Sequence, residues 1–272
     1  MPSGLHHDRE GSGPPLLLLA GIGSSSAAWN PVVPLLAAER ELWRLDLPGF
    51  GRSEPLPAGD PCGLDALADA ATRFCDEAGL ERPHVAGNSL GGAVALELGR
   101  RDRVASVTVL SPSGFASRAG QAFAGRSLAL TYWAAGRLRP VAAKAFRRPG
   151  LRRLLLGQMY AHPERVAPGE AYASLVTLRD GAGFLDTLAA LDGHRFAGEV
   201  AVPVTVAWGV RDGLLLPNQA LRARRLLPGA RHVWLRGCGH VPMSDDPEQV
   251  ARVLLEGSAA PAAQNALASA NG

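Results

Sequence analysis

Apolar residues along this chain gather in short runs that alternate with amphipathic stretches. Early runs lie at 16–20, 42–47 and 84–87. Between the last two, residues 64–78 place apolar side chains at three- and four-residue steps, which is helix spacing. Later runs lie at 104–110, 202–209 and 231–235. Strand-length runs separated by helices predict an α/β fold with a mostly parallel sheet and helices on both faces.

The strand pattern disappears between residues 114 and 196, where the chain is Arg-rich and has helical spacing. This segment leaves after one predicted strand and returns before the next, at the edge where open α/β sheets bind ligands. We therefore expect a helical cap, called the cap segment below. The predicted organisation is a core at 1–113 and 197–256, the cap segment at 114–196, and a disordered tail at 257–272, where small residues form no apolar face.

Charge is unevenly distributed along the chain. Residues 111–160 contain nine Lys and Arg and no Asp or Glu, which leaves −6 for the rest because the whole chain carries +3. A solvated helical face is the simplest interpretation, and an anionic substrate or a membrane surface are the alternatives. The small total charge does not indicate nucleic-acid binding.

Composition restricts the class of protein further. With 47% hydrophobic and 19% charged residues, the chain can bury a large core. It has neither a signal-peptide pattern nor a run of the roughly 18 to 20 apolar residues that cross a membrane, so we expect a cytoplasmic location and no membrane span. Three cysteines without metal-type spacing predict free thiols, with no metal or cofactor. The sequence does not indicate an oligomeric state.

The stretch "HVAGNSLGGAVALEL" at 84–98 changes from a strand-like run to helical spacing at Ser89. A strand, a sharp turn and a helix in this order expose the turn residue above the sheet. Gly87, Gly91 and Gly92 remove the Cβ atoms that would collide where strand and helix nearly touch. Ser89 is therefore the candidate nucleophile, and a plain helix N-cap is the alternative.

A serine nucleophile needs a base and a group that orients the base. Asp212 directly follows the run at 202–209, and His240 lies in a Gly-rich loop after the run at 231–235. We expect the remaining histidines to be structural or exposed: His6 and His7 in a terminal arm, His84 and His232 in strands, and His162 and His194 in the cap segment. Asp245 and Asp246 could compete as the acid, but "DDPEQV" is typical of a helix N-cap with Pro in the first turn.

With Ser89, Asp212 and His240 in this order, the chain resembles the α/β-hydrolase superfamily from about Pro14 to Leu255. Four motifs carry the resemblance: "DLPGFGRS", "GNSLGG", "WGVRDGLLLP" and "GCGHVPMSDDPE". The resemblance implies that Ser89 attacks the substrate and that His240 acts as base and then as acid. Asp212 would fix the imidazole tautomer.

A tetrahedral intermediate also needs backbone NH groups aimed at its oxyanion. The resemblance implies that Leu90, after the nucleophile, and Ile22, in the loop after the first run, donate these groups. Ala20 stands where the family usually has a histidine that braces this loop. Ser24, Ser25 and Ser26 could brace it instead, although we expect them to cap the next helix.

Serine at the turn argues against the related haloalkane dehalogenases and epoxide hydrolases, which use aspartate. We expect a cofactor-independent serine hydrolase that acts on a small acyl or carboxylic ester substrate through an acyl-enzyme. "GNSLGG" also resembles the carbon-carbon bond hydrolases of ring-cleavage diketone acids, whose anionic substrates would suit a basic cap. Acyl transfer and thioester cleavage would use the same three residues, and non-catalytic ligand binding also occurs on this fold.

Overall fold

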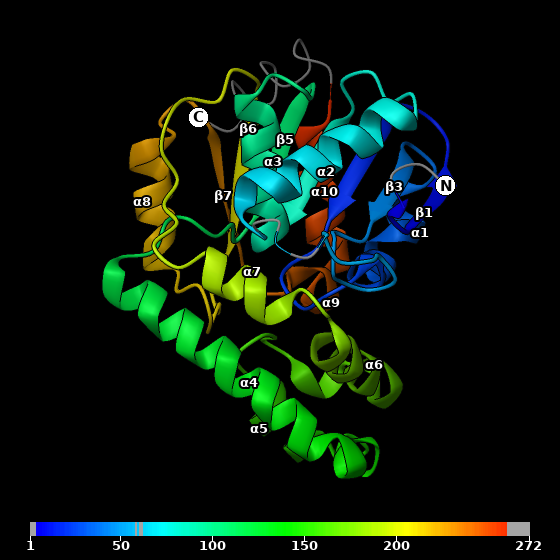
Figure 1. Ribbon diagram of the computed structural model, residues 1–272, viewed down its shortest axis with the longest axis vertical. Helices are drawn as coiled ribbons and strands as arrows, with labels where there is room; N and C mark the ends of the chain where they lie inside the picture. The colour runs from blue at the N-terminus through cyan, green and yellow to red at the C-terminus, as the bar shows by residue number, and fades with distance from the viewer. Residues whose placement is uncertain (1–3, 58, 60–61, 260–272) are drawn as a thin grey trace.

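The computed structural model describes residues 4–57, 59 and 62–259, and a mostly parallel sheet forms its centre (Figure 1). Its seven strands lie in the order β1-β3-β2-β4-β5-β6-β7. β1 pairs antiparallel with β3, and all other neighbours pair in parallel. The strands are β1 (His7–Gly11), β2 (Pro15–Leu19), β3 (Glu41–Leu45), β4 (His84–Asn88), β5 (Ser106–Leu110), β6 (Val204–Gly209) and β7 (Arg231–Leu235). The predicted α/β class is confirmed.

Helices cover both faces of the sheet because side chains alternate across each strand. Leu17 and Leu19 of β2 belong to one apolar layer, and Leu16 and Leu18 to the other. The first layer includes α2 (Leu64–Glu77), α3 (Leu90–Arg100) and α8 (Asn218–Leu226). The second includes η2 (Ser26–Val32), α1 (Val33–Leu36), α9 (Pro242–Asp245) and α10 (Pro247–Gly257).

The chain between β5 and β6 is helical and gathers at one end of the molecule (Figure 1). Its elements are α4 (Arg118–Ala145), α5 (Pro149–Leu156), η3 (Pro163–Arg165), α6 (Pro168–Asp180) and α7 (Phe184–Ala190). A small apolar cluster of its own, which includes Phe146 and Leu175, holds α4 against α6. All of these elements fall within the cap segment.

Strand β1 departs from the prediction of a terminal arm. Its sequence "HDREG" lacks the apolar alternation that indicates a strand. It pairs along its whole length with β3, and ion pairs from Arg9 to Glu41 and from Arg44 to Glu10 at 3.0 Å join the same two strands. Most of the tail expected to be disordered lies outside the described residues. Of its first residues, Gly257 ends α10 and Ser258 is buried.

Two of the predicted thiols are buried in the core. Burial raises the pKa of Cys75 and of Cys238 to about 12. Within residues 4–57, 59 and 62–259, no helix combines the length and the apolarity that a bilayer crossing requires.

Candidate functional site

Ser89 occupies a sharp turn between β4 and α3. Its backbone has φ 55° and ψ −115°, a strained conformation for a residue with a Cβ. Its amide donates to the Leu110 carbonyl at 3.0 Å, and its carbonyl accepts from the Ser113 amide at 3.0 Å. The Ser89 side chain makes no capping hydrogen bond to α3. The helix-cap alternative is therefore not supported.

Glycines let the strand and the helix approach each other around this turn. A Cβ at Gly87 would lie 2.1 Å from the Gly91 carbonyl oxygen, and a Cβ at Gly91 would lie 2.2 Å from the Leu19 carbonyl oxygen. Both obstacles are backbone atoms, which cannot rotate away. This crowding is the physical reason for the glycine spacing around Ser89.

His240 and Asp212 meet from two different loops. Nδ1 of His240 and Oδ2 of Asp212 are 2.8 Å apart, and both side chains are almost fully buried. The other Asp212 oxygen accepts from the amides of Leu214 and Leu215 at 2.9 and 2.8 Å. The carboxylate is thus fixed on both oxygens, and it can orient the imidazole by accepting the Nδ1 proton.

Asn88 links the Ser89 turn to the His240 loop. Its side-chain amide donates to the Leu110 carbonyl at 2.9 Å and to the His240 carbonyl at 3.0 Å. In the sequence, Asn88 stands out only as part of a family motif, which assigns it no role. Ser89, Asp212 and His240 therefore lie in one region at the carboxyl ends of β4, β6 and β7, where hydrogen bonds join His240 to Asp212 and to Asn88. Among the described residues, the Ser89 hydroxyl makes no hydrogen bond to His240.

Ile22 and Leu90 lie beside Ser89, as an oxyanion site would require. All three residues line one small cavity of about 100 Å³. Leu90 is the first residue of α3, so its NH has no acceptor within the helix. Gly21 approaches closely, since a Cβ there would lie 3.2 Å from the Ser89 Cβ.

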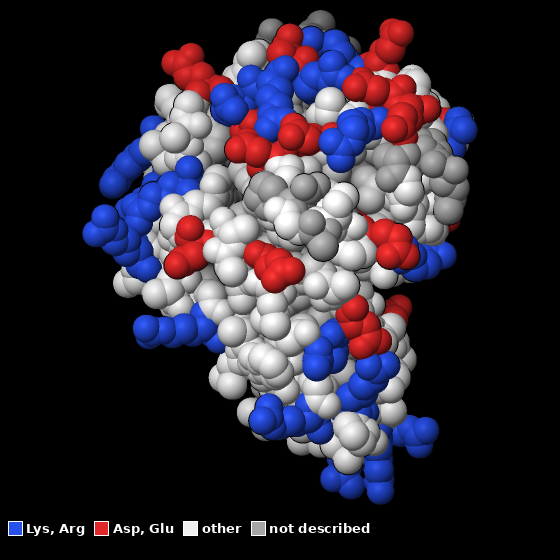
Figure 2. Space-filling model, viewed as in Figure 1, with Lys and Arg blue, Asp and Glu red and all other residues white. Residues whose placement is uncertain are grey.

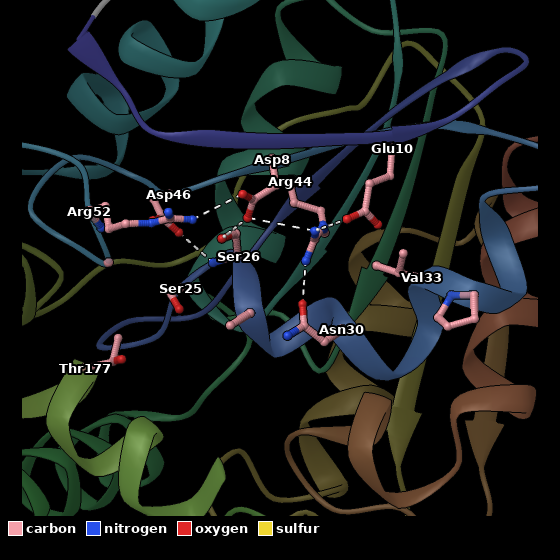
Figure 3. Close-up of a pocket in the computed structure, with 13 residues that line it drawn as sticks. Asp8, Glu10, Ser25, Ser26, Asn30, Val33, Arg44, Asp46, Arg52 and Thr177 are labelled. Atoms are coloured by element: carbon pink, nitrogen blue, oxygen red, sulfur yellow. Dashed lines mark hydrogen bonds and ion pairs between the residues drawn. The ribbon is translucent and has the colours of Figure 1, made fainter. Parts of the chain in front are cut away.

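Carboxylates at the start of η2 hold the loop that carries Ile22, and the residue at position 20 does not. Ala20 is buried in an apolar layer. One oxygen of Asp46 accepts from the Ser26 amide at 2.6 Å, and the other accepts from the Arg52 amide at 2.9 Å. The Ser26 hydroxyl donates to Asp8 at 2.9 Å (Figure 3).

These contacts correct the expectation that the serines cap this helix. Ser25 precedes η2 but makes no side-chain capping bond, because Asp46 serves the helix N-terminus instead. Asp8, Ser26 and Asp46 border an open cleft of about 650 Å³. In this cleft, Arg44 lies between Asp8 and Glu10 (Figure 3). Although burial raises the pKa of Asp8, the Ser26 hydroxyl and nearby guanidinium groups hold it below its ordinary value.

Asp245 joins the His240 loop to the cap segment, a role that the sequence does not reveal. Its carboxylate accepts from the amides of Gly239 at 2.8 Å, Ala161 at 3.0 Å and His162 at 2.9 Å. Asp246, its neighbour, caps α10 by accepting from the Gln249 amide at 2.9 Å. The interpretation of "DDPEQV" as a helix N-cap followed by Pro247 therefore holds, with Asp246 as the capping residue. Asp245 and Ala161 are 84 residues apart in the sequence, so no local sequence pattern indicates their contact.

A larger cavity of about 500 Å³ lies between the sheet edge and the cap segment. Ser89 and His240 form part of its wall, and most of the rest is apolar: Ile22, Ala27, Ala28, Pro31, Leu128, Leu130, Ala134, Ala135, Leu138, Phe146, Leu154, Leu155, Leu156, Met159, Val166, Ala173, Leu175, Leu178, Leu214 and Val241. Among the described residues of this wall, Glu170 is the one Asp, Glu, Lys or Arg. Burial raises the pKa of Tyr160, so this phenol lines the wall in its neutral form.

The smaller cavity at Ser89 is also mostly apolar. Leu188, Leu191 and Leu215 line it, together with His194 of the cap segment. Burial lowers the pKa of His194. Ser89 thus borders two cavities of unequal size, which suits a reacting carbonyl with a group on each side. Over the described part of the chain, no group of three or more His, Cys, Asp or Glu side chains is arranged to hold a metal ion.

Comparison with known proteins gives the family. The sequence model of the family described as alpha/beta hydrolase fold matches residues 14–247, which is most of the chain. The chain therefore belongs to the α/β hydrolase fold family.

Three similar proteins illustrate the range of this family. The dihydrolipoyllysine-residue acetyltransferase component of the acetoin cleaving system of Pseudomonas putida is 31% identical over 250 residues, which cover 89% of this chain but 63% of that protein. The pimeloyl-(acyl-carrier protein) methyl ester esterase of Aeromonas hydrophila subsp. hydrophila is 40% identical over 114 residues, or 41% of this chain and 43% of that one. The crystal structure of a membrane phospholipase A, a bacterial virulence factor, superimposes with a TM-score of 0.73 at 25% identity and covers 94% of this chain and 87% of its own.

The chain thus spans less than two thirds of the length of the acetyltransferase component. The family and these relatives support the interpretation that the chain is an enzyme. The names of the relatives differ in the chemical group that is cleaved or transferred.

Proposed function

We propose that the chain is a serine hydrolase that cleaves carboxylic esters with a large apolar part. The observation that carries this proposal is the buried His240 to Asp212 hydrogen bond of 2.8 Å beside Ser89, in the wall of an apolar cavity. A histidine oriented in this way can remove a serine proton, and an apolar wall favours an uncharged acyl or alcohol chain.

The reaction has two halves. The Ser89 hydroxyl oxygen attacks the ester carbonyl while His240 accepts its proton, and Asp212 stabilises the resulting imidazolium. The backbone NH groups of Ile22 and Leu90 stabilise the negative oxygen of the tetrahedral intermediate. The intermediate then collapses to an acyl-enzyme, and the alcohol leaves with the proton from His240. Water activated by His240 attacks the acyl-enzyme and releases the carboxylic acid.

The cavity wall bears on the alternative of carbon-carbon bond hydrolysis. Diketone acids from ring cleavage carry a carboxylate, which a Lys or Arg in the wall would stabilise. Among the described residues, the wall of the larger cavity contains neither, and its one carboxylate, Glu170, would repel such a substrate. Two of the similar proteins are named as an esterase and as a phospholipase. We therefore favour ester cleavage.

A series of p-nitrophenyl esters of increasing acyl length tests the proposal. We expect kcat/KM to rise from the acetate to the octanoate ester, because the longer chain buries more apolar surface in the larger cavity. The Ser89→Ala variant should lose about 10⁴-fold or more of this activity and still fold.

Ser117→Ala is the matched control, because Ser117 is a true helix N-cap whose side chain accepts from the Gly120 amide at 3.1 Å. It should lose about 1 kcal/mol of stability and keep its activity. Equal ester hydrolysis by wild type and Ser89→Ala would refute the proposal.

A further inference from the structure

One face of α4 carries exposed apolar and cationic side chains in a single stripe. Three- and four-residue steps connect Phe123, Arg126, Leu130, Trp133, Arg137 and Val141, and Lys144 continues the series. Residues at these steps lie on one side of a helix. All of these side chains are exposed, with Leu130 at 71% and Trp133 at 50%. We call this surface the α4 stripe.

The cations of the α4 stripe stand apart from the ion pairs of the described residues. Within the part of the chain that the structure describes, no carboxylate lies in ion-pair distance of Arg126, Arg137 or Lys144. Two other cations of the cap segment have acidic partners: Arg139 pairs with Asp180 at 2.6 Å, and Arg153 pairs with Glu164 at 3.2 Å. Figure 2 shows Lys and Arg around the tip of the cap segment, at the lower end of the view. The basic charge seen in the sequence is thus concentrated at this end of the molecule.

The α4 stripe borders the mouth of the larger cavity. Leu130 belongs to the stripe and also lines the cavity. Leu154 of α5 lines the same cavity and is 78% exposed. Side chains that line a cavity and face solvent at once mark its opening, so the apolar interior continues into the apolar part of the stripe.

We infer that the α4 stripe docks on an anionic lipid surface. Trp and Leu side chains insert at the boundary between headgroups and acyl chains, while Arg and Lys bind the lipid phosphates. An acidic protein partner would account for the cations. It would not account for the exposed Leu130, Trp133 and Leu154 beside an apolar opening. With the stripe on a bilayer, an amphiphile's chain can enter the cavity without crossing water.

Vesicle binding of the full chain tests this inference. The Ser89→Ala protein is used so that no lipid is consumed, and co-sedimentation is measured with sucrose-loaded vesicles of phosphatidylcholine alone and of phosphatidylcholine with phosphatidylglycerol. We expect binding to the anionic vesicles, with weaker binding at high salt. A variant with Arg126→Glu, Arg137→Glu and Lys144→Glu should bind roughly 100-fold less, because each cation contributes to attraction by the anionic surface.

A second variant and a control separate this surface from general charge effects. Phe123→Ser with Trp133→Ser removes apolar contacts outside the cavity wall and should weaken binding while all charges remain. Leu221→Ser with Arg224→Glu and Arg225→Glu makes a similar change on exposed residues of α8, outside the α4 stripe, and should bind like the parent protein. Circular dichroism checks that each variant folds.

Two results would overturn the inference. The first is binding to neither vesicle type, and an acidic protein would then be the partner that fits the charge. The second is a loss of binding in the α8 control as large as that in the α4 stripe variants. The delivery of an amphiphile to Ser89 rests on the proposed function, but vesicle binding does not. Anionic vesicle binding without ester hydrolysis by wild type would refute the proposed function and leave the docking surface intact.

Discussion

The sheet edge around Ser89 and the cap segment differ in how tightly they are packed. Every residue of α3 from Leu90 to Gly99 is buried, and the Leu19 backbone leaves no room for a Cβ at Gly91. Helix α4 has 28 residues, of which four are buried. Its Gly125 has open space where a Cβ would be. Under the proposed function, the tightly packed edge holds the reacting groups, and the loosely buried segment governs which molecules reach them.

The largest predicted effect concerns the reacting groups at the rigid edge. Ser89→Ala and His240→Ala should each lower kcat by about 10⁴-fold or more, and the double variant should be little worse, because the two side chains act as one unit. Ester turnover and thermal unfolding of the three variants are measured together. Multiplicative losses in the double variant would contradict a shared mechanism.

The next largest effect is a change in the free energy of unfolding. It compares how tightly α3 and α4 are packed. Gly91→Ala places a Cβ 2.2 Å from the Leu19 carbonyl oxygen, so we expect a loss of about 3 kcal/mol or more in the free energy of unfolding. Gly125→Ala in α4 meets no atom within 4 Å and should stabilise by up to about 1 kcal/mol through helix propensity. Denaturant unfolding measures both. Similar losses in the two variants would mean that the regions are packed alike.

Asp245 connects the two regions, and its removal tests whether they are coupled. Asp245→Asn replaces an acceptor of three amide protons with a group that has one acceptor oxygen, so the His240 loop and residues 161 and 162 should separate. We expect kcat to fall by about 100-fold, because small displacements of a reacting group are costly. Cleavage by trypsin in the Arg-rich cap segment should become faster.

Asp246→Asn is the matched control, since Asp246 caps α10, while the amides of residues 161 and 162 donate to Asp245. Because Asn caps helices about as well as Asp, this change should cost well under about 1 kcal/mol of stability and leave both kcat and trypsin cleavage near the wild-type values. If Asp245→Asn behaved like this control, the two regions would not be coupled through this carboxylate.

The smallest effect is the pH dependence of stability. Burial lowers the pKa of His84 in the core, helped by Arg40, and burial also lowers the pKa of His194 in the cap segment. The unfolded chain therefore binds these protons at higher pH than the folded protein does. Their contribution to stability is intact above the ordinary value of 6.5 and is lost as the pH falls below it.

Urea unfolding on either side of that pH measures the effect. His84→Gln and His194→Gln should each reduce the loss of stability on acidification. His232→Gln, which removes a half-buried imidazole from β7, serves as the comparison. Unchanged pH dependence in the first two variants would contradict the assignment to these imidazoles.

Much of the site could be predicted from sequence because its signals are local. Ser89 stands between glycines at a change of periodicity, and Asp212 and His240 follow apolar runs directly. Contacts between distant residues gave no such signal. Asp46 anchors the start of η2 from 20 residues away, and Asp245 binds the cap segment across more than 80. Strand β1 was missed because its polar sequence has no apolar pattern, although it pairs with β3 over five residues and carries ion pairs to it.

Labelling with a fluorophosphonate, followed by mapping of the adduct, tests the central claim most directly. The reagent forms a covalent bond only with a serine whose proton a base removes, and the adduct resembles the tetrahedral intermediate. We predict a phosphonylated Ser89 in wild type, no adduct in Ser89→Ala and much slower labelling in His240→Ala. A folded wild-type protein without an adduct, or with an adduct on another serine, would contradict the assignment of Ser89 as an activated nucleophile.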